Sequence, residues 1–381
     1  MGLPIVGETF QFFKSSTAFD IPDFYKLRFE RYSPLFKTIG RPVVISMDME
    51  IDRFIFRQDK LFQLWYPDSA NSIIGKKSIA SCYGSVHKYM RSIGGPYFAP
   101  KNLKEAFISE MESIITESLG RWATKPSIEV NEAVMNMMFD LVAKKLIGFE
   151  PRSEKTKELK KQFDAFYKGL MSFPLYVPGT QYYRSMQGRK YVQKVIKDLL
   201  KQRICAPEKQ YGDFLDIVAE ELRSGNAQEE HDAILNTRQK RESRMSWEEL
   251  KSSKFTTQVT NEIVRLTSNG PGIFRITLND VQVKAGWLVM ISPVAVHLNR
   301  AYFEDPLTFN PWRWQEANGS SLMKNFIPFG DGTRHCMGAE FSKLLIAMFL
   351  HTLVTKYRWK EIKGGGIFRV SEVVFPQGYH I

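Results

Sequence analysis

The sequence predicts a mainly helical fold with small peripheral β-sheets. Apolar residues recur at helical spacing over 130–146 and again, among many lysines and arginines, over 182–203. Each pattern buries one stripe of a helix and leaves a charged face in water, so both segments are interpreted as structural. Short strands are indicated only near the two ends of the chain, as at 36–47, where a Gly-Arg-Pro turn separates two apolar runs.

Length and composition indicate a folded globular protein. The chain has 381 residues, of which 43% are apolar and 13% aromatic, so it can bury a large core. It contains no internal repeat and no linker rich in proline, glycine and serine. We therefore expect a single domain over 1–381.

Charge and cysteine usage narrow the partners and the compartment. The formal net charge of +12 suits nucleic acid, an anionic membrane surface or an acidic protein, but the lysines and arginines are dispersed along the chain. We therefore expect no nucleic-acid partner. The three cysteines, Cys82, Cys205 and Cys336, are too few and too scattered for a disulfide framework, which favours a reducing compartment.

A membrane span is not predicted, but one loop is unusually apolar. No stretch reaches the length of a spanning helix, and the first residues lack the layout of a secretory signal. Between two predicted helices, 170–181 reads "LMSFPLYVPGTQ". It is punctuated by Pro174, Pro178 and Gly179, and is too apolar for an ordinary surface connection. We expect this loop to contact a membrane surface or substrate.

Cys336 is the strongest candidate for chemistry. It follows Arg334 and directly precedes an apolar helical run, where the helix dipole and nearby cation favour a thiolate. A thiolate is a nucleophile or a metal ligand. None of the six histidines stands in a known Cys–His catalytic setting, and a zinc site needs several ligands at short spacing. A third option is the iron of a macrocycle, which needs only one axial thiolate from the protein.

The residues around the cysteine suit that third option. From Phe329 to Gly338 the chain reads F-G-x-G-x-R-x-C-x-G. Gly330, Gly332 and Gly338 would let the backbone approach a flat macrocycle, Phe329 would pack on the sulfur side, and Arg334 would neutralise a propionate. A buried structural cysteine is the alternative. With this pattern the sequence resembles the cytochrome P450 superfamily of haem-thiolate monooxygenases, which implies haem held by Cys336 as the axial ligand.

The resemblance extends to charged residues elsewhere. "NEIVR" supplies Glu262 and Arg265 on one helical face, and "FNPWRW" supplies Arg313. In the family these three form a Glu-Arg-Arg network that holds the haem-side core together and takes no part in the chemistry.

The family also implies three further contacts to the haem propionates. Arg275 stands where a strand arginine contacts a propionate. "HKYMR" corresponds to a W-x-x-x-R helix, with His87 in place of tryptophan and Arg91 retained. The alternative for His87 and Arg275 is an ordinary surface charge.

At finer grain the chain resembles plant hydroxylases of sterols, brassinosteroids and triterpenoids, through "GLPIVGETFQFF", "FQLWYPDSA", "DPLTFNPWRW" and "TKYRWKEIKGG". The resemblance implies a hydrophobic small-molecule substrate, with Phe375 and Tyr379 near it, and oxygen insertion with electrons from NADPH through a reductase. It also implies the cytosolic face of the endoplasmic reticulum membrane.

Three departures from the family suggest an incomplete version of that fold. The chain begins at "GLPIVGE", without the preceding membrane anchor, and "VQVKAGWLVM" is shorter than the family's strand hairpin. The [AG]-G-x-[DE]-T helix of the distal haem face has no counterpart, so no distal catalytic residue is identified. "AEELRSGNAQ" runs straight into "EEHDAIL", and Gln228–Glu229 resembles a join between segments that are normally far apart.

These departures leave two alternatives to a monooxygenase open. One is an inert haem-binding protein, which would be an unproductive splice or annotation variant. The other is a haem-thiolate isomerase of hydroperoxides, which needs no external oxygen and could dispense with the distal acid and alcohol.

Overall fold

The structure, a computed structural model, describes residues 8–12, 14–17, 20–31, 35–38, 41–170, 172–224, 254–268, 272–276, 286–315, 321–369 and 373–381. The predicted join at Gln228–Glu229 and most of the shortened hairpin lie outside these residues. Residue contacts divide the chain into two compact units. The first comprises Met1–Trp65, Ser127–Asn131 and Glu248–Ile381, and the second comprises Tyr66–Pro126 and Glu132–Trp247.

A five-stranded sheet forms the core of the first unit. Its strands follow the order β2 (Leu35–Thr38), β3 (Arg41–Ser46), β6 (Leu288–Ile291), β5 (Gly272–Ile276), β4 (Phe62–Leu64). The pair β3–β6 is parallel, with Val43 opposite Leu288, and the other pairs are antiparallel. All four residues of β6 are buried, and alternate side chains join different apolar clusters. The strand pair predicted at 36–47 is confirmed as β2 and β3.

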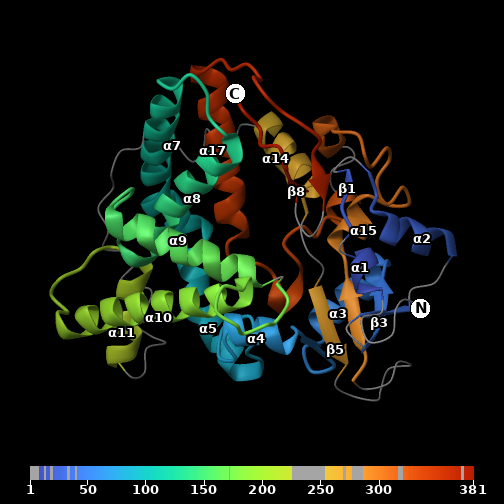
Figure 1. Cartoon of the computed structure of the whole chain (residues 1–381), viewed down its shortest axis with the longest axis horizontal. Coiled ribbons are helices and arrows are strands. Elements are labelled where there is room, and N and C mark those ends of the chain that lie inside the picture. The colour runs from blue at the N-terminus through green and yellow to red at the C-terminus, as the bar shows by residue number, and fades with distance from the viewer. Residues whose placement is uncertain are drawn as a thin grey trace. The chain divides into compact units, whose positions relative to one another are not determined.

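Eight helical segments and a smaller sheet complete the described part of the first unit (Figure 1). The smaller sheet pairs β1 (Ser16–Thr17), β7 (Phe368–Arg369) and β8 (Val373–Val374). The helices are α1 (Thr9–Phe12), α2 (Asp23–Arg31), α3 (Met49–Arg57), α14 (Lys254–Leu266), α15 (Pro293–His297), η2 (Pro311–Trp314), η3 (Gly332–Arg334) and α17 (Ala339–Lys356). Helix α14 packs against both η2 and α17.

The second unit is helical throughout its described part. It contains α4 (Asp68–Ile74), α5 (Gly84–Tyr97), α6 (Pro100–Asn102), the π-turn η1 (Leu103–Phe107), α7 (Ile108–Ala123), α8 (Val130–Ile147, from Glu132 onward), α9 (Glu154–Gly169), α10 (Gln181–Cys205) and α11 (Phe214–Ser224). The two helices predicted around 130–146 and 182–203 are confirmed as α8 and α10, and Met137 and Leu141 of α8 are buried.

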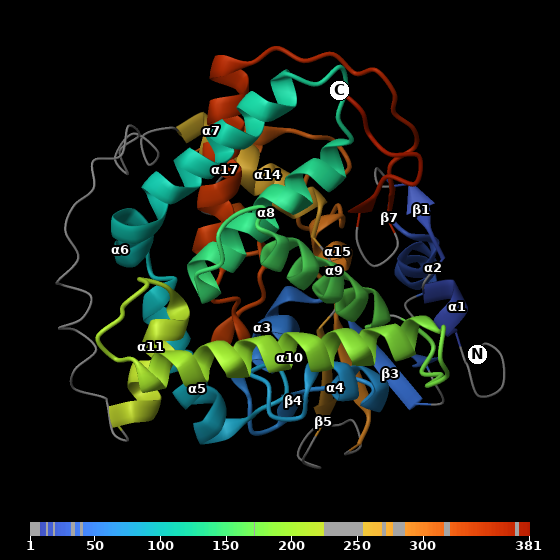
Figure 2. The same ribbon diagram turned by 60° about the vertical axis from the view of Figure 1, so that its left-hand side comes forward.

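Helices α9 and α10 lie side by side in both ribbon views (Figures 1 and 2). Gly188 of α10 makes this close approach possible, because a Cβ there would lie 2.5 Å from the carbonyl oxygen of Gln162. The chain between the two helices is the apolar loop noted in the sequence. Together the two units show a mainly helical protein with small sheets, as the sequence predicts. Among the described residues, no helix is both long and apolar enough to span a membrane.

One buried charge in the first unit makes stability depend on pH. Asp52 of α3 is fully buried. Burial raises its pKa from 3.8 to about 7, and the charge of Asp48 acts in the same direction. The folded state therefore holds this proton while the unfolded chain releases it. Stability from this group is present at low pH and is lost as the pH rises from 3.8 to about 7.

We expect Asp52→Asn to stabilise the protein at pH 8 by about 2–4 kcal/mol, because the amide never ionises. At pH 4 the two proteins should unfold at similar denaturant concentrations. Glu50→Gln, on the exposed side of the same helix, is the matched control and should change stability little at either pH. A pH-independent effect of Asp52→Asn in urea unfolding would contradict this account.

Candidate functional site

Cys336 closes a tight loop at the start of α17. Its N–H donates to the carbonyl oxygen of Phe329 at 2.9 Å, and its own carbonyl oxygen accepts from the N–H of Ala339 at 3.3 Å. The thiol is free and exposed. Gly338 is the N-cap of α17, and no side-chain hydrogen bond caps the start of this helix.

Two glycines allow this loop to lie against α3. Gly332 has φ +59°, and a Cβ there would lie 2.4 Å from the carbonyl oxygen of Phe56. Gly330 has φ +74°, a left-handed conformation that other residues rarely adopt. Asp331 accepts from the N–H of Gly332 at 2.7 Å and lies 3.9 Å from the guanidinium of Arg57. The loop backbone is therefore held close to α3, with the thiol on its exposed side.

Three cationic side chains of the first unit, on three different elements, are candidates for binding an anionic group. Arg334 lies in η3 and is half-buried. Lys343 of α17 places its Nζ 5.9 Å from the ring centre of Phe329. Arg275 is exposed on β5, opposite Gln63 and Leu288, and its guanidinium forms no hydrogen bond or ion pair with any described residue. Its guanidinium is available to an anionic group.

His87 and Arg91 occur one turn apart on α5, in the second unit. His87 is buried, so the alternative of an ordinary surface position is wrong for it, whereas Arg91 is half-buried. A histidine surrounded by the helical core of its unit is not a solvated charge. The assignment of both residues to haem propionates stays a prediction.

The structure brings Glu262, Arg265 and Arg313 together in one buried cluster. Arg265 donates twice to Glu262, from Nε at 2.9 Å and from a terminal nitrogen at 2.8 Å. Arg313 donates from Nε to the same carboxylate at 3.1 Å. Burial alone would raise the pKa of Glu262, but the bonds and charges of the two arginines and the Asn310 N–H hold it below its ordinary value.

The two guanidiniums also bind the backbone of the irregular segments around them. Arg265 donates to the carbonyl oxygens of His297 at 2.7 Å and Pro306 at 2.8 Å. Arg313 donates to the carbonyl oxygens of Glu304 at 2.7 Å and Asp305 at 3.2 Å. These carbonyl groups lie outside regular strands, so the cluster satisfies backbone acceptors that strand pairing leaves open. Two of them, those of His297 and Pro306, belong to buried residues.

Sequence reasoning missed two members of this region. Trp314 donates from Nε1 to Glu262 at 2.9 Å, and its place beside Arg313 in "FNPWRW" was a signal for it. His297 is fully buried and contacts both the cluster and the segment before the cysteine. As a lone histidine between apolar residues, it carries no sequence signal. Phe375 and Tyr379 lie with ring centres 6.0 Å apart, and their contact with substrate stays a prediction.

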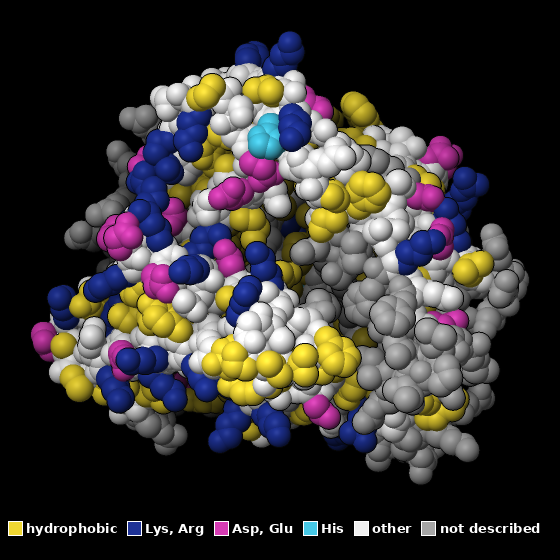
Figure 3. All heavy atoms as spheres, viewed as in Figure 1, with side chains coloured by type: hydrophobic (Ala, Val, Ile, Leu, Met, Phe, Trp, Pro, Cys, Tyr) yellow, Lys and Arg dark blue, Asp and Glu magenta, His cyan; other side chains and the backbone are white. Residues whose placement is uncertain are grey.

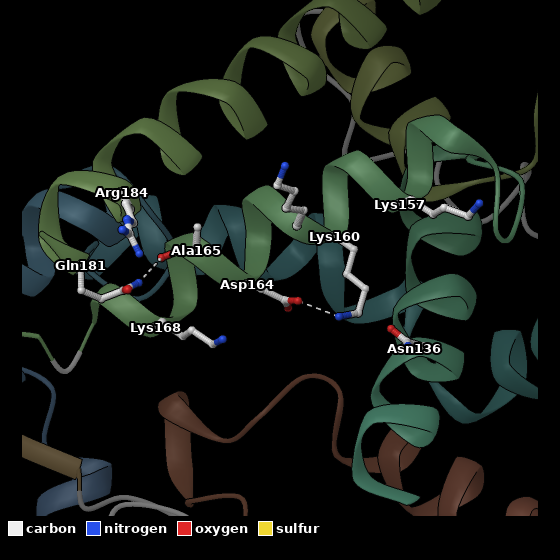
Figure 4. Close-up of a pocket in the computed structure, with 9 residues that line it drawn as sticks. Asn136, Lys157, Lys160, Asp164, Ala165, Lys168, Gln181 and Arg184 are labelled. Carbon is white, nitrogen blue, oxygen red and sulfur yellow. Dashed lines mark hydrogen bonds and ion pairs between the residues drawn. The ribbon is translucent and has the colours of Figure 1, made fainter. Parts of the chain in front are cut away.

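The second unit carries a basic groove of about 480 Å³ (Figure 4). Its lining comes from α8, α9 and α10, and consists of Asn136, Lys157, Lys160, Lys161, Asp164, Ala165, Lys168, Gln181 and Arg184. Lys160 pairs with Asp164 at 2.6 Å. Lys168 and Arg184 are exposed and form no ion pair with any described residue. The groove therefore presents net positive charge.

Comparison with known proteins decides the family. A cytochrome P450 family model matches residues 224–374. Cytochrome P450 87A3 of Oryza sativa subsp. japonica is 41% identical over 100% of this chain and 84% of its own length. The chain belongs to the cytochrome P450 family. It is thus a haem-dependent oxidoreductase of the monooxygenase type.

Other relatives and a solved P450 structure agree. The β-amyrin 16-α-hydroxylase of Maesa lanceolata is 33% identical over 100% of this chain and 91% of its own length. The cholesterol 16,22-dihydroxylase of Trigonella foenum-graecum is 32% identical with 100% and 90% covered. The retinoic acid-bound cyanobacterial CYP120A1 structure shares the fold, with a TM-score of 0.80 and 22% identity over 100% of this chain and 97% of that one.

The described residues of this P450 fit a haem. A flat, doubly anionic macrocycle needs an iron ligand, bare backbone beside it and cations for its carboxylates. The described residues offer the exposed free thiol of Cys336, the loop glycines, and the exposed guanidinium of Arg275, which has no partner among them. No group of three or more His, Cys, Asp or Glu side chains in the described part could hold a metal ion by itself.

We expect Glu262→Ala to destabilise the P450 by about 3–5 kcal/mol, because it leaves two guanidiniums buried without their carboxylate. Urea unfolding of the full chain measures this loss. Glu340→Ala is the matched control, since Glu340 pairs with Lys343 at 3.3 Å on the surface and should contribute less than about 1 kcal/mol. Equal losses in the two variants would contradict the importance of the cluster.

Proposed function

We propose that this P450 inserts one oxygen atom into an unactivated C–H bond of a sterol or triterpenoid. The observation that carries the proposal is the F-G-x-G-x-R-x-C-x-G loop, with its exposed thiol, in a chain aligned end to end with plant enzymes that oxidise such molecules. Cucurbitadienol 11-hydroxylase of Siraitia grosvenorii, 33% identical, adds another triterpenoid enzyme. A hydroperoxide isomerase is disfavoured because these relatives are named as hydroxylases.

In this proposal the cysteine loop holds the haem. Cys336 would bind the haem iron, Phe329 would pack beside the sulfur, and the bare backbone of Gly330 and Gly338 would allow close approach. When bound, the haem supplies the iron chemistry that activates dioxygen. The thiolate donates electron density that favours this activation.

Arginines hold the propionates in the same proposal. The residues assigned to this role, by resemblance to the family, are Arg275, Arg334, Arg91 and His87. A planar guanidinium suits this role because it binds a carboxylate bidentately and keeps its charge when buried. We assign no distal catalytic residue.

The redox partner in this proposal is an NADPH-dependent cytochrome reductase. The chain carries a net charge of +12, which favours docking of an acidic flavoprotein. The site of action is the cytosolic face of the endoplasmic reticulum membrane.

The interior of the chain is short relative to its relatives. The alignment with the rice protein runs over 435 positions, which is 54 more than the 381 residues of this chain. We place the main gap at Gln228–Glu229, where the family's distal helix would stand. That helix keeps the haem pocket dry and helps deliver protons to the reacting oxygen. The gap favours a second candidate function, an inert haem-binding variant.

We expect the 381-residue chain to show little or no hydroxylation of sterols or triterpenoids with reductase and NADPH. Its NADPH consumption should yield mainly peroxide, because water reaches an uncovered pocket. Insertion at Gln228–Glu229 of the corresponding segment of the rice relative should restore coupled turnover, measured as hydroxylated product per NADPH. Well-coupled turnover by the short chain would overturn the placement of the gap.

Cys336→Ala tests the haem assignment in both the 381-residue chain and the chain with the inserted segment, and Cys205→Ala is its control. The variant should lose the carbon monoxide difference spectrum of a thiolate haem, and Cys205→Ala should keep it, since Cys205 is an exposed thiol at the end of α10. A thiolate spectrum retained by Cys336→Ala would contradict the assignment. Turnover of a lipid hydroperoxide without NADPH would instead favour the isomerase.

A membrane surface is the second partner in this proposal. Phe173 is 82% exposed, and Leu175, Tyr176 and Val177 are each about half exposed. Lys168 and Gln181 stand at the two ends of this apolar loop and line the basic groove. Figure 3 shows hydrophobic side chains gathered on this face with lysines and arginines beside them. Apolar side chains flanked by cations suit an anionic bilayer.

We expect the double variant Phe173→Ser, Val177→Ser to bind phosphatidylcholine–phosphatidylserine vesicles about tenfold or more weakly, because it removes two exposed apolar anchors. The double variant Lys168→Glu, Arg184→Glu should bind the anionic phosphatidylcholine–phosphatidylserine vesicles more weakly. Its binding to vesicles of pure phosphatidylcholine should be unchanged. Ile362→Ser, which alters a 60% exposed residue of the first unit, is the control. Unchanged cosedimentation of all variants would exclude this surface.

A further inference from the structure

His297 occupies a fully buried position at the end of α15, and its ring contacts the segment just before the cysteine loop. Its ring lies among aromatic side chains, with centres 5.6 Å from Phe326 and 5.9 Å from Phe303. Nε2 lies 3.1 Å from the backbone nitrogen of Ile327. Nδ1 lies 2.8 Å from Oγ of Ser268. Both ring nitrogens therefore have partners.

These two contacts determine the protonation state of the ring. The N–H of Ile327 can only donate, so Nε2 must accept and carries no proton. The proton is then on Nδ1, which donates to Ser268, and the Ser268 hydroxyl donates onward to the carbonyl oxygen of Val264 at 2.8 Å. Burial lowers the pKa of His297 to about 3, and the charges of Arg265 and Arg369 act in the same direction. The ring is neutral at physiological pH and its orientation is defined.

His297 joins two parts of the site that are otherwise distant in sequence. Its carbonyl oxygen accepts from Arg265 at 2.7 Å, the guanidinium that also binds Glu262. Its ring accepts from Ile327, whose own carbonyl oxygen accepts from Gly330 at 3.1 Å. Phe329, between these two residues, accepts the N–H of Cys336. One residue thus connects the buried cluster to the backbone that positions the thiol.

We propose that His297 is a positioning residue for the haem thiolate, because its ring holds the start of the cysteine loop to the Glu262–Arg265–Arg313 cluster. The proposal rests on the proposed role of Cys336 as the iron ligand, and names a determinant of where that ligand lies. His297 itself contacts neither haem nor substrate in this role. Its loss should let the segment before Phe329 shift, which would weaken the iron–sulfur bond without removing the cysteine.

Two substitutions of similar chemistry separate this role from simple packing. His297→Gln keeps an acceptor oxygen at the reach of Nε2, so it can still bind the N–H of Ile327. His297→Asn is shorter and can replace only the contact of Nδ1 with Ser268. Both remove the ring, so packing loss affects both. Thr352→Ala is the control, since it removes a buried side-chain hydrogen bond to the carbonyl oxygen of Met348 in α17, away from the loop.

The experiment measures two quantities on the full chain. The first is hydrogen exchange at the Ile327 amide, which needs no haem. The second is the fraction of ferrous haem whose carbon monoxide spectrum shows a thiolate ligand. In His297→Asn we expect exchange at Ile327 to accelerate about tenfold or more, as follows from loss of one buried hydrogen bond, and the thiolate fraction to fall several-fold. His297→Gln should retain most of both, and Thr352→Ala should match wild type.

Ser268→Ala serves as a second variant that leaves the ring in place, in case His297→Asn fails to fold. It removes the acceptor of the Nδ1 proton, so the ring loses one of the two hydrogen bonds that define its orientation. Ile327 exchange should rise several-fold and the thiolate fraction should decline. Wild-type values of both quantities in Ser268→Ala, or equal losses in the Gln and Asn variants, would overturn the proposal. A thiolate spectrum in Cys336→Ala would instead refute the ligand assignment, and the exchange result would still stand.

Discussion

The fully buried carboxylate of Glu262 is the constraint on which the first unit depends. A buried charge is tolerated only when partners surround it, and here two guanidiniums, the indole of Trp314 and the N–H of Asn310 satisfy both oxygens. Each guanidinium has donors left over, and these bind backbone carbonyl groups of the irregular segment between α15 and η2. One acidic residue therefore organises a stretch of chain that has little regular structure of its own.

The cysteine loop is linked to this arrangement through hydrogen bonds of His297. It is held at its start through His297 and Ile327, at Gly332 against α3, and at its end by the N–H of Cys336. None of these contacts uses the sulfur atom, so the thiol remains exposed and available to a ligand. This separation of holding groups from the reacting group suits a site that must position a cofactor to within a fraction of an ångström.

The second unit presents a different kind of surface. Gly188 allows the close contact between α9 and α10. The loop between these helices exposes apolar side chains beside a basic groove. Apolar and cationic groups placed together suit an anionic bilayer.

The sequence by itself determined the fold class, the family, the cysteine loop and the long helices α8 and α10, because each depends on residues a few positions apart in the chain. Contacts over long separations were decided only by the tertiary structure. His297 meets a backbone amide 30 residues away, and this role leaves no local pattern in the sequence. Trp314 meets a carboxylate 52 residues away, and its only sequence signal is its place beside Arg313. The same holds for the burial of His87 and Asp52. Whether a polar side chain is solvated or enclosed depends on which distant elements pack around it, and that is a property of the folded chain.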